Sequence, residues 1–294
     1  MEKIEKSGFL LVDKPPNLTS REVIDKLKEK FSFEKIGHTG TLDPFATGLL
    51  VLAINKATRF VEYLQKEKKA YQALLELGKI SFSYDIEMPV MYVHNLKVPR
   101  KEEVEKILSQ FKGKQNQIPP EISAKRVKGR RAYEVFRKER KLLNLKPKEI
   151  EVYEIFLLDY DFPYLSLYTL VSSGTYIRAL ARDIGKALKT GAILKDLRRV
   201  SIGSLSISQA KSLKELLSLN KKELEDLIMP IDQALSFEPY FLSKKDAKRF
   251  LNGNKVFLSN KLSGLFKVYE KDKKTFLGIA KIVSGCLYPL KVLK

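Results

Sequence analysis

Alternating apolar and polar stretches divide the chain into strands and helices. Strand-length runs rich in apolar, β-branched and aromatic residues cover residues 8–14, 49–54, 69–77, 150–158, 164–171 and 200–207. Apolar residues at helical spacing predict helices over residues 19–31, 101–111 and 175–188, one that begins near residue 57, and two that end near residue 228. Because strands and helices alternate without a regular βαβ period, we predict a mixed sheet and an α+β fold.

The first predicted helix has a defined start. Thr19 and Glu22 have the spacing of a capping box, in which each side chain bonds to the backbone of the other residue. The turn before it contains Pro15, Pro16 and Asn17, a stiff combination that ends a strand. We therefore expect the strand at residues 8–14 to turn sharply into this helix.

The composition changes near Pro239. Residues 240–294 carry thirteen Lys and Arg against three Asp and Glu, and glycines separate their short β-type runs. We expect residues 1–235 to form one domain and residues 236–294 to form a small β-barrel module. The charge density of this module indicates a surface that grips nucleic acid.

The whole chain is strongly basic, with 55 Lys and Arg against 35 Asp and Glu. This charge indicates a polyanionic partner, either nucleic acid or an anionic membrane surface. No apolar run approaches the roughly 20 residues of a spanning helix, and the polar start does not resemble a signal peptide. The single Cys286 cannot form an intrachain disulfide, which suits the cytoplasm. With only His38 and His94 beside it, we expect no zinc site, and no spacing supports a carboxylate-bound metal.

Residues 37–44, with the sequence GHTGTLDP, are the strongest candidate for a reactive loop. Two glycines allow the backbone to approach a ligand closely, and Pro44 restricts Asp43 to extended backbone. The apolar run at residues 49–54 is expected to be a buried strand that anchors the loop. Taken alone, the same residues also suit an ordinary turn. Gly37 to Gly40 also matches the GXXG loop of KH domains, but the following strand and the Asp-Pro pair argue against that interpretation.

Four further segments carry candidate chemistry. Tyr71 begins a strand, where its ring could stack on a base or simply pack in the core. Residues 118–133 mix prolines, cations and a tyrosine, which suits a phosphate-tracking segment better than a solvated loop. Arg178 opposes the dipole of its helix, so it is either a surface residue or has a carboxylate or phosphate partner. Arg198 and Arg199 follow a predicted small-residue turn and suit phosphate contact or a solvated pair.

Together these segments resemble the TruB family of bacterial tRNA pseudouridine-55 synthases over nearly the full chain. The resemblance rests on ordered motifs at residues 8–20, 37–48, 56–59, 69–71, 119–133, 173–185 and 197–199. The tail resembles the small RNA-binding β module, called PUA-like, that ends many members. This resemblance implies a pseudouridine-synthase fold, with a mixed, mainly antiparallel β-sheet flanked by helices and loops, followed by a PUA-like β-barrel domain.

The resemblance also implies roles for individual residues. Asp43 matches the family's catalytic aspartate, Tyr71 its active-site tyrosine, and Arg178 the arginine that pairs with the aspartate. His38 matches the histidine that helps to hold the flipped-out nucleotide conformation. The remaining matches, which we assign to substrate binding, are the pocket or RNA-contact positions Tyr176, Leu197 and Arg59 and the early motif lysine Lys14.

Two positions depart from the family pattern. Asn17 stands where the family commonly has glycine, and asparagine also tolerates the left-handed conformation. The usual Thr-Asp-Thr-x-Asp after the tyrosine strand is replaced by SFSYD at residues 81–85, where only Asp85 fully keeps the pattern. The role of this segment is therefore open, whereas the catalytic residues are intact.

The implied reaction converts uridine 55 in the T-loop of tRNA to pseudouridine. It replaces an N-glycosidic bond by a C-glycosidic bond without redox change or group transfer, so one carboxylate suffices and we expect no cofactor. The base must leave its stack, and Arg178 is expected to keep Asp43 ionised. Whether Asp43 attacks the sugar, removes a ribose proton or adds to the uracil ring is left open.

Two other functions are compatible with the same residues. A nucleic-acid glycosylase or base-exchange enzyme also uses a carboxylate and base flipping, and a non-catalytic RNA chaperone needs only the basic surfaces. The resemblance allows a tRNA-folding chaperone activity beside the enzymatic one. The expected partner is the T-arm stem-loop of tRNA, with no required protein partner and no membrane, and a monomer is the family's usual state.

Overall fold

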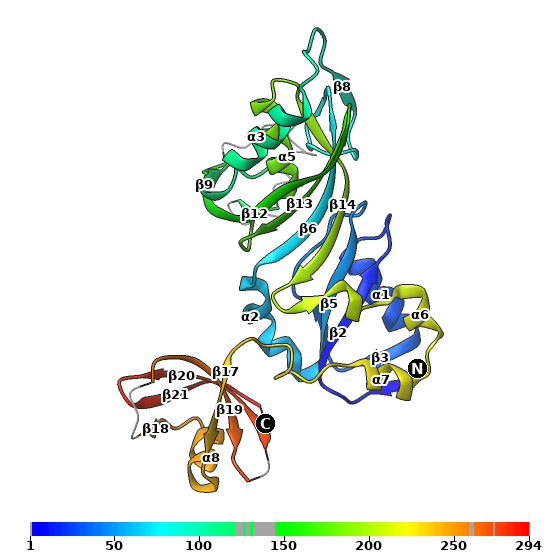
Figure 1. The fold of residues 1–294 in the computed structure, drawn as a ribbon. Helices are drawn as coiled ribbons and strands as arrows, with labels where there is room; N and C mark the ends of the chain where they lie inside the picture. The colour runs from blue at the N-terminus through cyan, green and yellow to red at the C-terminus, as the bar shows by residue number, and fades with distance from the viewer. Residues whose placement is uncertain are drawn as a thin grey trace.

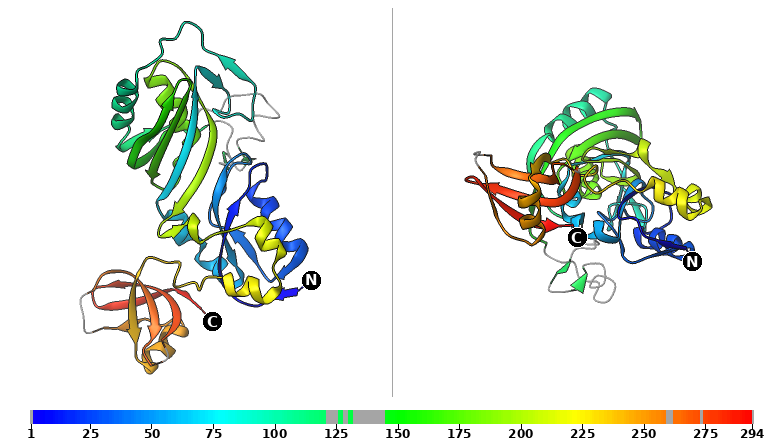
Figure 2. Two further views of the ribbon diagram at one scale, coloured as in Figure 1. Left: turned by 45° about the vertical axis from the view of Figure 1, so that its right-hand side comes forward. Right: turned by 90° about the horizontal axis from the view of Figure 1, so that it is seen from below.

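The computed structural model describes residues 2–120, 126–127, 130–131, 145–258, 262–272 and 274–293. The molecule is elongated, with a large sheet towards one end and a five-stranded sheet at the other (Figure 1). The turned views in Figure 2 also show the C-terminal strands, coloured orange and red, outside the large sheet. Within the described ranges, no helix is long and apolar enough to cross a membrane.

The large sheet has ten strands in the order β16-β2-β5-β14-β6-β13-β12-β9, with β4 added at β5 and β15 at β14. Its strands are β2 (Gly8–Lys14), β4 (Ile36–His38), β5 (Thr47–Ile54), β6 (Lys69–Leu77), β9 (Gly113–Gln117), β12 (Lys148–Asp161), β13 (Tyr164–Val171), β14 (Ala192–Ile202), β15 (Leu205–Ser206) and β16 (Lys211–Ser212). The pairs β14–β5 and β16–β2 are parallel, whereas the other pairs described in this sheet are antiparallel. The predicted α+β fold with a mixed, mainly antiparallel sheet is confirmed.

The helices gather in two groups around this sheet (Figure 1). Helix α3 (Lys101–Gln110) packs against β12, and α5 (Ile177–Ala187) packs against β14. Near β2 lie α1 (Ser20–Lys30), α6 (Leu213–Ser218) and α7 (Lys221–Leu227), with the strands β1 (Glu2–Ile4) and β3 (Phe31–Phe33). The connection from β5 to β6 is the 3₁₀ turn η1 (Asn55–Phe60) followed by α2 (Val61–Lys66). The remaining short elements are β7 (Lys79–Ser81), β8 (Val90–Tyr92), β10 (Arg126–Val127), β11 (Arg130–Arg131) and η2 (Ile207–Gln209).

The predicted turn into α1 is confirmed in detail. The Thr19 hydroxyl accepts a hydrogen bond from the Glu22 amide at 3.1 Å, and the Glu22 carboxylate accepts one from the Thr19 amide at 2.7 Å. Asn17 has a φ of 63°, the left-handed conformation that asparagine tolerates. This cap fixes the start of α1, whose apolar side then packs into the core beside the loop of residues 37–44.

The start of one predicted strand was wrong. β14 begins at Ala192 and not at residue 200. The sequence pattern missed this start because irregular register after Leu194 and after Arg199 breaks the alternation of buried and exposed positions that a regular strand shows. Arg198 and Arg199 therefore lie inside a central strand and do not follow a turn. Arg198 pairs with Asp13 at 2.7 Å, and Arg199 is buried, so they are not a solvated pair.

The C-terminal sheet is a curled five-stranded sheet with its own small core. Its strands β17 (Glu238–Leu242), β18 (Val256–Phe257), β19 (Gly264–Glu270), β20 (Thr275–Val283) and β21 (Cys286–Val292) pair in the order β17-β19-β20-β21-β18, and α8 (Lys244–Leu251) packs on them. The sequence predicted β18, β19 and β20. It missed β17 and β21, each of which contains a proline, and α8, where basic residues outnumber apolar ones.

The two sheets are in contact through η1 and α2. The ring of Phe60 lies 6.0 Å from that of Phe276, and the ring of Tyr63 lies 5.4 Å from that of Phe237. Lys291 adds an ion pair to Glu62 at 2.9 Å. The C-terminal sheet therefore packs on the segment that leads directly into β6, which carries Tyr71.

Candidate active site

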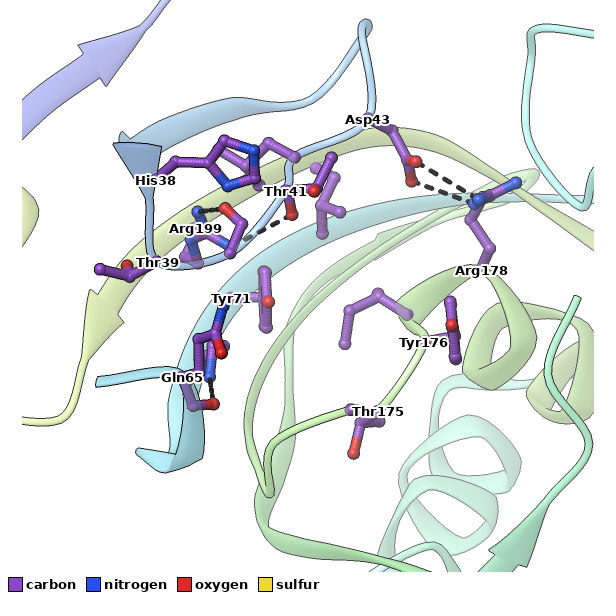
Figure 3. Close-up of a pocket in the computed structure, with 16 residues that line it drawn as sticks. His38, Thr39, Thr41, Asp43, Gln65, Tyr71, Thr175, Tyr176, Arg178 and Arg199 are labelled. Atoms are coloured by element: carbon purple, nitrogen blue, oxygen red, sulfur yellow. Dashed lines mark hydrogen bonds and ion pairs between the residues drawn. The ribbon is translucent and has the colours of Figure 1, made fainter. Parts of the chain in front are cut away.

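A pocket of about 450 Å³ lies where the loop after β4 meets β6, β14 and the start of α5 (Figure 3). It is lined by His38, Thr39, Gly40, Thr41, Leu42, Asp43, Gln65, Lys69, Tyr71, Gly174, Thr175, Tyr176, Ile177, Arg178, Leu197 and Arg199. Six of the eight predicted site residues are among them. The structure thus brings residues from widely separated parts of the chain to one cavity.

Neighbouring segments hold the loop that carries Asp43 through hydrogen bonds to the backbone groups of the loop. The Ser20 hydroxyl accepts a hydrogen bond from the Leu42 amide at 2.9 Å, and the Thr39 amide donates to the Val51 carbonyl at 3.0 Å. Lys14 donates to the carbonyl of Pro44 at 3.0 Å. These bonds anchor the loop to α1, β5 and β2, so Asp43 has a fixed position before any ligand arrives.

Arg199 is the loop support that sequence reasoning missed. Its guanidinium donates to the carbonyls of Leu49 at 2.7 Å and Gly40 at 3.0 Å, and more weakly to that of Thr41 at 3.5 Å. The strands can approach this closely because Gly48 has no side chain: with a φ of 97°, a Cβ there would lie 2.3 Å from the Arg199 carbonyl oxygen. A misplaced start for β14 concealed this role.

Asp43 and Arg178 lie in direct contact on one side of the pocket (Figure 3). Arg178 Nε lies 3.0 Å from Asp43 Oδ2, and Arg178 Nη2 donates to Asp43 Oδ1 at 3.3 Å. Both carboxylate oxygens are therefore engaged by one planar guanidinium, which fixes the carboxylate in orientation as well as position. Of the two alternatives that the sequence left open for Arg178, the structure shows the one with a carboxylate partner.

Asp85 is a second carboxylate on Arg178, and it gives residues 81–85 a role. Its Oδ2 lies 3.1 Å from Arg178 Nη1, and its side chain is fully buried. Its other oxygen accepts hydrogen bonds from the Ser83 hydroxyl and from the Glu87 amide, the latter at 2.9 Å. Burial raises the pKa of Asp85, although Ser83 and Arg178 oppose this shift. The segment therefore holds the far edge of the guanidinium.

The floor of the pocket is apolar and aromatic. Tyr71 and Leu197 come from the paired strands β6 and β14 and are almost fully buried. Tyr176 stands at the N-cap of α5, where its backbone is held on both sides by the Gln117 side chain, at 2.9 and 3.1 Å. A flat, apolar base fits between such side chains better than a charged ligand does.

His38 lies in the same pocket wall with an unsatisfied ring nitrogen. Its Nδ1 is buried and has no hydrogen-bond partner among the described residues. Burial, and then the neighbouring Arg199, lower the pKa of His38. The imidazole is consequently neutral at pH 7 and can offer hydrogen bonds without adding charge.

Three family models, each for a different domain, match successive parts of this chain. Models described as TruB family pseudouridylate synthase (N-terminal domain), tRNA pseudouridylate synthase B C-terminal domain, and Pseudouridine synthase II TruB, C-terminal, cover residues 28–177, 178–236 and 241–293. The tRNA pseudouridine synthase B of Aquifex aeolicus is 40% identical over 97% of this chain and 99% of its own length. That of Clostridium kluyveri is 38% identical over 92% of this chain and 94% of its own. The chain belongs to the TruB family of pseudouridylate synthases.

A similar fold is found in a solved structure of an RNA–protein complex. A chain in the structure of an H/ACA RNP bound to a substrate RNA containing 2′-deoxyuridine matches with a TM-score of 0.75 and 22% identity, over 98% of this chain and 85% of that chain. At this identity the match shows a shared fold. As a TruB-family member, the protein is a pseudouridine synthase, which is an isomerase.

Two predicted substrate-binding residues lie outside the pocket lining. Lys14 is buried behind the loop, where it also donates to the carbonyls of Pro15 at 2.9 Å and Leu18 at 2.6 Å. Burial lowers its pKa to about 8. Arg59 is exposed on η1. Lys14 thus supports the site from behind, while the surface position of Arg59 suits a contact to the outer parts of a large substrate.

Residues 118–133 fall mostly outside the described residues. Within this segment, the structure describes residues 118–120 and the short paired strands β10 and β11. In the part of the chain that the structure describes, no group of three or more His, Cys, Asp or Glu residues could hold a metal ion.

Replacing Asp85 by asparagine should slow chemistry without weakening RNA binding. The change removes the negative charge beside Arg178 Nη1, which keeps its hydrogen bond to the Ser83 carbonyl at 3.2 Å but loses its ionic partner. We expect the guanidinium and Asp43 to shift and the single-turnover rate to be about 10- to 100-fold lower. Affinity for RNA should stay within about threefold, because Asp85 is buried and makes no surface contact. Asp183→Asn is the control, since Asp183 pairs with Arg182 on the same helix. An unchanged rate for Asp85→Asn would contradict this role.

The lowered pKa of His38 can be measured directly, because the chain contains only two histidines. An imidazole NMR titration should show one midpoint below the ordinary value of 6.5, because burial and Arg199 disfavour the charged ring. A His38→Gln variant assigns the resonance by its loss, which leaves the exposed His94. A midpoint at the ordinary value would show that the ring is solvated, and one above it would show that the ring is paired with an acid.

Proposed function

We propose that this protein converts uridine 55 in the T-loop of tRNA to pseudouridine, with Asp43 as the essential carboxylate. The observation that carries the proposal is the bidentate contact between Arg178 and Asp43 above a pocket floored by Tyr71 and Leu197. The tRNA substrate is supported by the relatives, which are named tRNA pseudouridine synthase B. The proposal needs no cofactor, because the reaction is an isomerisation without net redox change.

The pocket suits a base that has been flipped out of its stack. Its volume of about 450 Å³ is in the range of small-molecule sites and is open to solvent at the loop. The uracil ring is proposed to lie against Tyr71 and Tyr176, with the ribose beside Asp43 and with Arg178 orienting the carboxylate. His38 is proposed to hold the flipped conformation from the opposite wall. The stacking and hydrogen bonds offset the few kcal/mol that unstacking costs.

The C-terminal residues 236–294 are proposed to be an RNA-binding domain, and residues 1–235 the catalytic domain. The exposed face of α8 carries Lys244, Lys245, Lys248 and Arg249, which can contact phosphates. Phe241 and Phe257 are 49% and 69% exposed, as expected for rings that stack on nucleotides. In this proposal the enzyme acts as a cytoplasmic monomer.

Asp43→Ala should abolish pseudouridine formation while leaving tRNA affinity within a few-fold. The carboxylate takes part in bond exchange, whereas binding depends on phosphate contacts elsewhere. The measurement is mass-spectrometric mapping of pseudouridine in one tRNA transcript treated with wild type and variant, beside a binding titration. Wild-type protein that binds tRNA but leaves its uridine unchanged would contradict the proposal, and release of free uracil would favour a glycosylase.

Neutralising Lys244, Lys245 and Lys248 together with glutamine should weaken tRNA binding and reduce its salt dependence. Each lost phosphate contact lowers the slope of log K against log salt by roughly 0.7–0.9. Substitution is preferable to deletion of the domain, because deletion would expose Phe60 and Tyr63. The control is the triple glutamine variant of Lys28, Lys214 and Lys222, which lie outside this domain. Equal slopes for wild type and the α8 variant would show that α8 faces away from RNA.

A further inference from the structure

Two buried cations form one wall of the pocket, and neither has a carboxylate within ion-pair distance among the described residues. Arg199 is 1% exposed and Lys69 is 8% exposed. The carboxylate nearest in sequence, Glu67, lies against Gly203 and does not pair with Lys69. Buried charges are normally paired, because an uncompensated one costs several kcal/mol. The wall formed by Arg199, Lys69 and Gly40, here called the cationic wall, therefore carries positive charge that no described carboxylate compensates at ion-pair distance.

Both cations keep hydrogen-bond donors beyond those that the protein uses. The Lys69 ammonium carries three N–H groups, and two of them donate to the carbonyls of Gln65 and Glu67, both at 2.9 Å. Arg199 makes three bonds to backbone carbonyls out of the five that a guanidinium can donate. Backbone carbonyls orient these groups without neutralising them. An acceptor that enters the pocket can thus find both charge and free N–H groups.

The backbone beside the two cations leaves room for such an acceptor. A Cβ on Gly40 would lie 3.7 Å from Arg199 Nη1 and 3.9 Å from Lys69 Cε, so a larger residue there would cover the side of both cations that lines the pocket. The adjacent Thr39 is 1% exposed, and its hydroxyl has no hydrogen-bond partner in the described part of the chain. The ring of His38, with its unsatisfied Nδ1, lies beside Arg199 (Figure 3). Two unsatisfied polar atoms therefore accompany the two unpaired cations.

We propose that the cationic wall binds one of the two phosphates that flank the target uridine. A phosphodiester supplies the missing negative charge and accepts several hydrogen bonds at once, which a neutral base or sugar hydroxyl cannot do. The assignment rests on the proposed function, because it takes RNA as the ligand. Asp43 and Arg178 lie on the other side of the pocket, so a phosphate fixed at the cationic wall sets the position of the ribose relative to Asp43.

The test is a double-mutant cycle between protein and RNA. Lys69→Gln is combined with T-arm stem-loops that carry a neutral methylphosphonate on the 5′ or the 3′ side of the target uridine, and affinities are measured in an Asp43→Asn background. We expect Lys69→Gln to weaken binding of unmodified RNA about tenfold, which corresponds to about 1.4 kcal/mol. With the methylphosphonate at one of the two positions, this loss should disappear, because the contact is already removed.

Matched variants make the result decisive. Lys66→Gln removes the same charge from an exposed position on α2 and should show no coupling to either methylphosphonate. Lys69→Arg keeps the charge and should keep the penalty for the neutral phosphate, which guards against misfolding of Lys69→Gln. An equal loss for all three RNAs would overturn the proposal and leave Lys69 as a support for the end of α2.

Failure of the proposed function is detected separately. The binding cycle requires no turnover, whereas pseudouridine formation by the wild-type protein is assayed on an unmodified transcript. Absence of pseudouridine with an intact cycle would reject the isomerase proposal alone. Pseudouridine formation with no coupling at either position would reject only the cationic wall as a phosphate site.

Discussion

The parallel pairing of β14 with β5 is the constraint on which the site depends. It places Arg198 and Arg199 beside Thr47 and Gly48, and the glycine allows the two backbones to meet without a side chain between them. From there the Arg199 guanidinium reaches the carbonyls of the loop that carries Asp43. One strand pairing in the core therefore helps to determine where Asp43 stands, because Arg199 ties the glycine-containing loop to the sheet.

The two buried arginines, Arg178 and Arg199, bind different kinds of acceptor in the site. Arg178 faces carboxylates on both sides, Asp43 and Asp85, so its charge is compensated within the protein and its planar shape orients the Asp43 carboxylate. Among the described residues, Arg199 donates to carbonyl oxygens and has no carboxylate partner, so it holds the backbone while its charge is not compensated there. A lysine could not replace either residue, because each uses donors that point in two or more fixed directions.

The sequence could predict those parts of the fold that depend on local pattern. The capping box at Thr19 and the left-handed Asn17 follow from short-range chemistry, and both are confirmed. The start of β14 could not be predicted, because its irregular register is set by pairing with β6. The role of Asp85 could not be predicted either, because its partner Arg178 lies 93 positions later in the sequence. Conversely, Lys14 and Arg59 were assigned by motif, and a motif does not show whether a side chain faces the pocket or the solvent.

The C-terminal sheet is more than an added RNA grip, because its docking site leads into the pocket. Phe276 and Phe237 pack on Phe60 and Tyr63, and α2 then runs to Gln65, whose carbonyl oxygen binds the Lys69 ammonium. The same few residues thus connect the basic domain with the pocket wall. Packing of aromatic rings at one end of α2 holds the position of a cation at the other end, since side chains in a close-packed contact move little. The position of the C-terminal sheet and the position of the Lys69 ammonium are in this way linked by a single short segment.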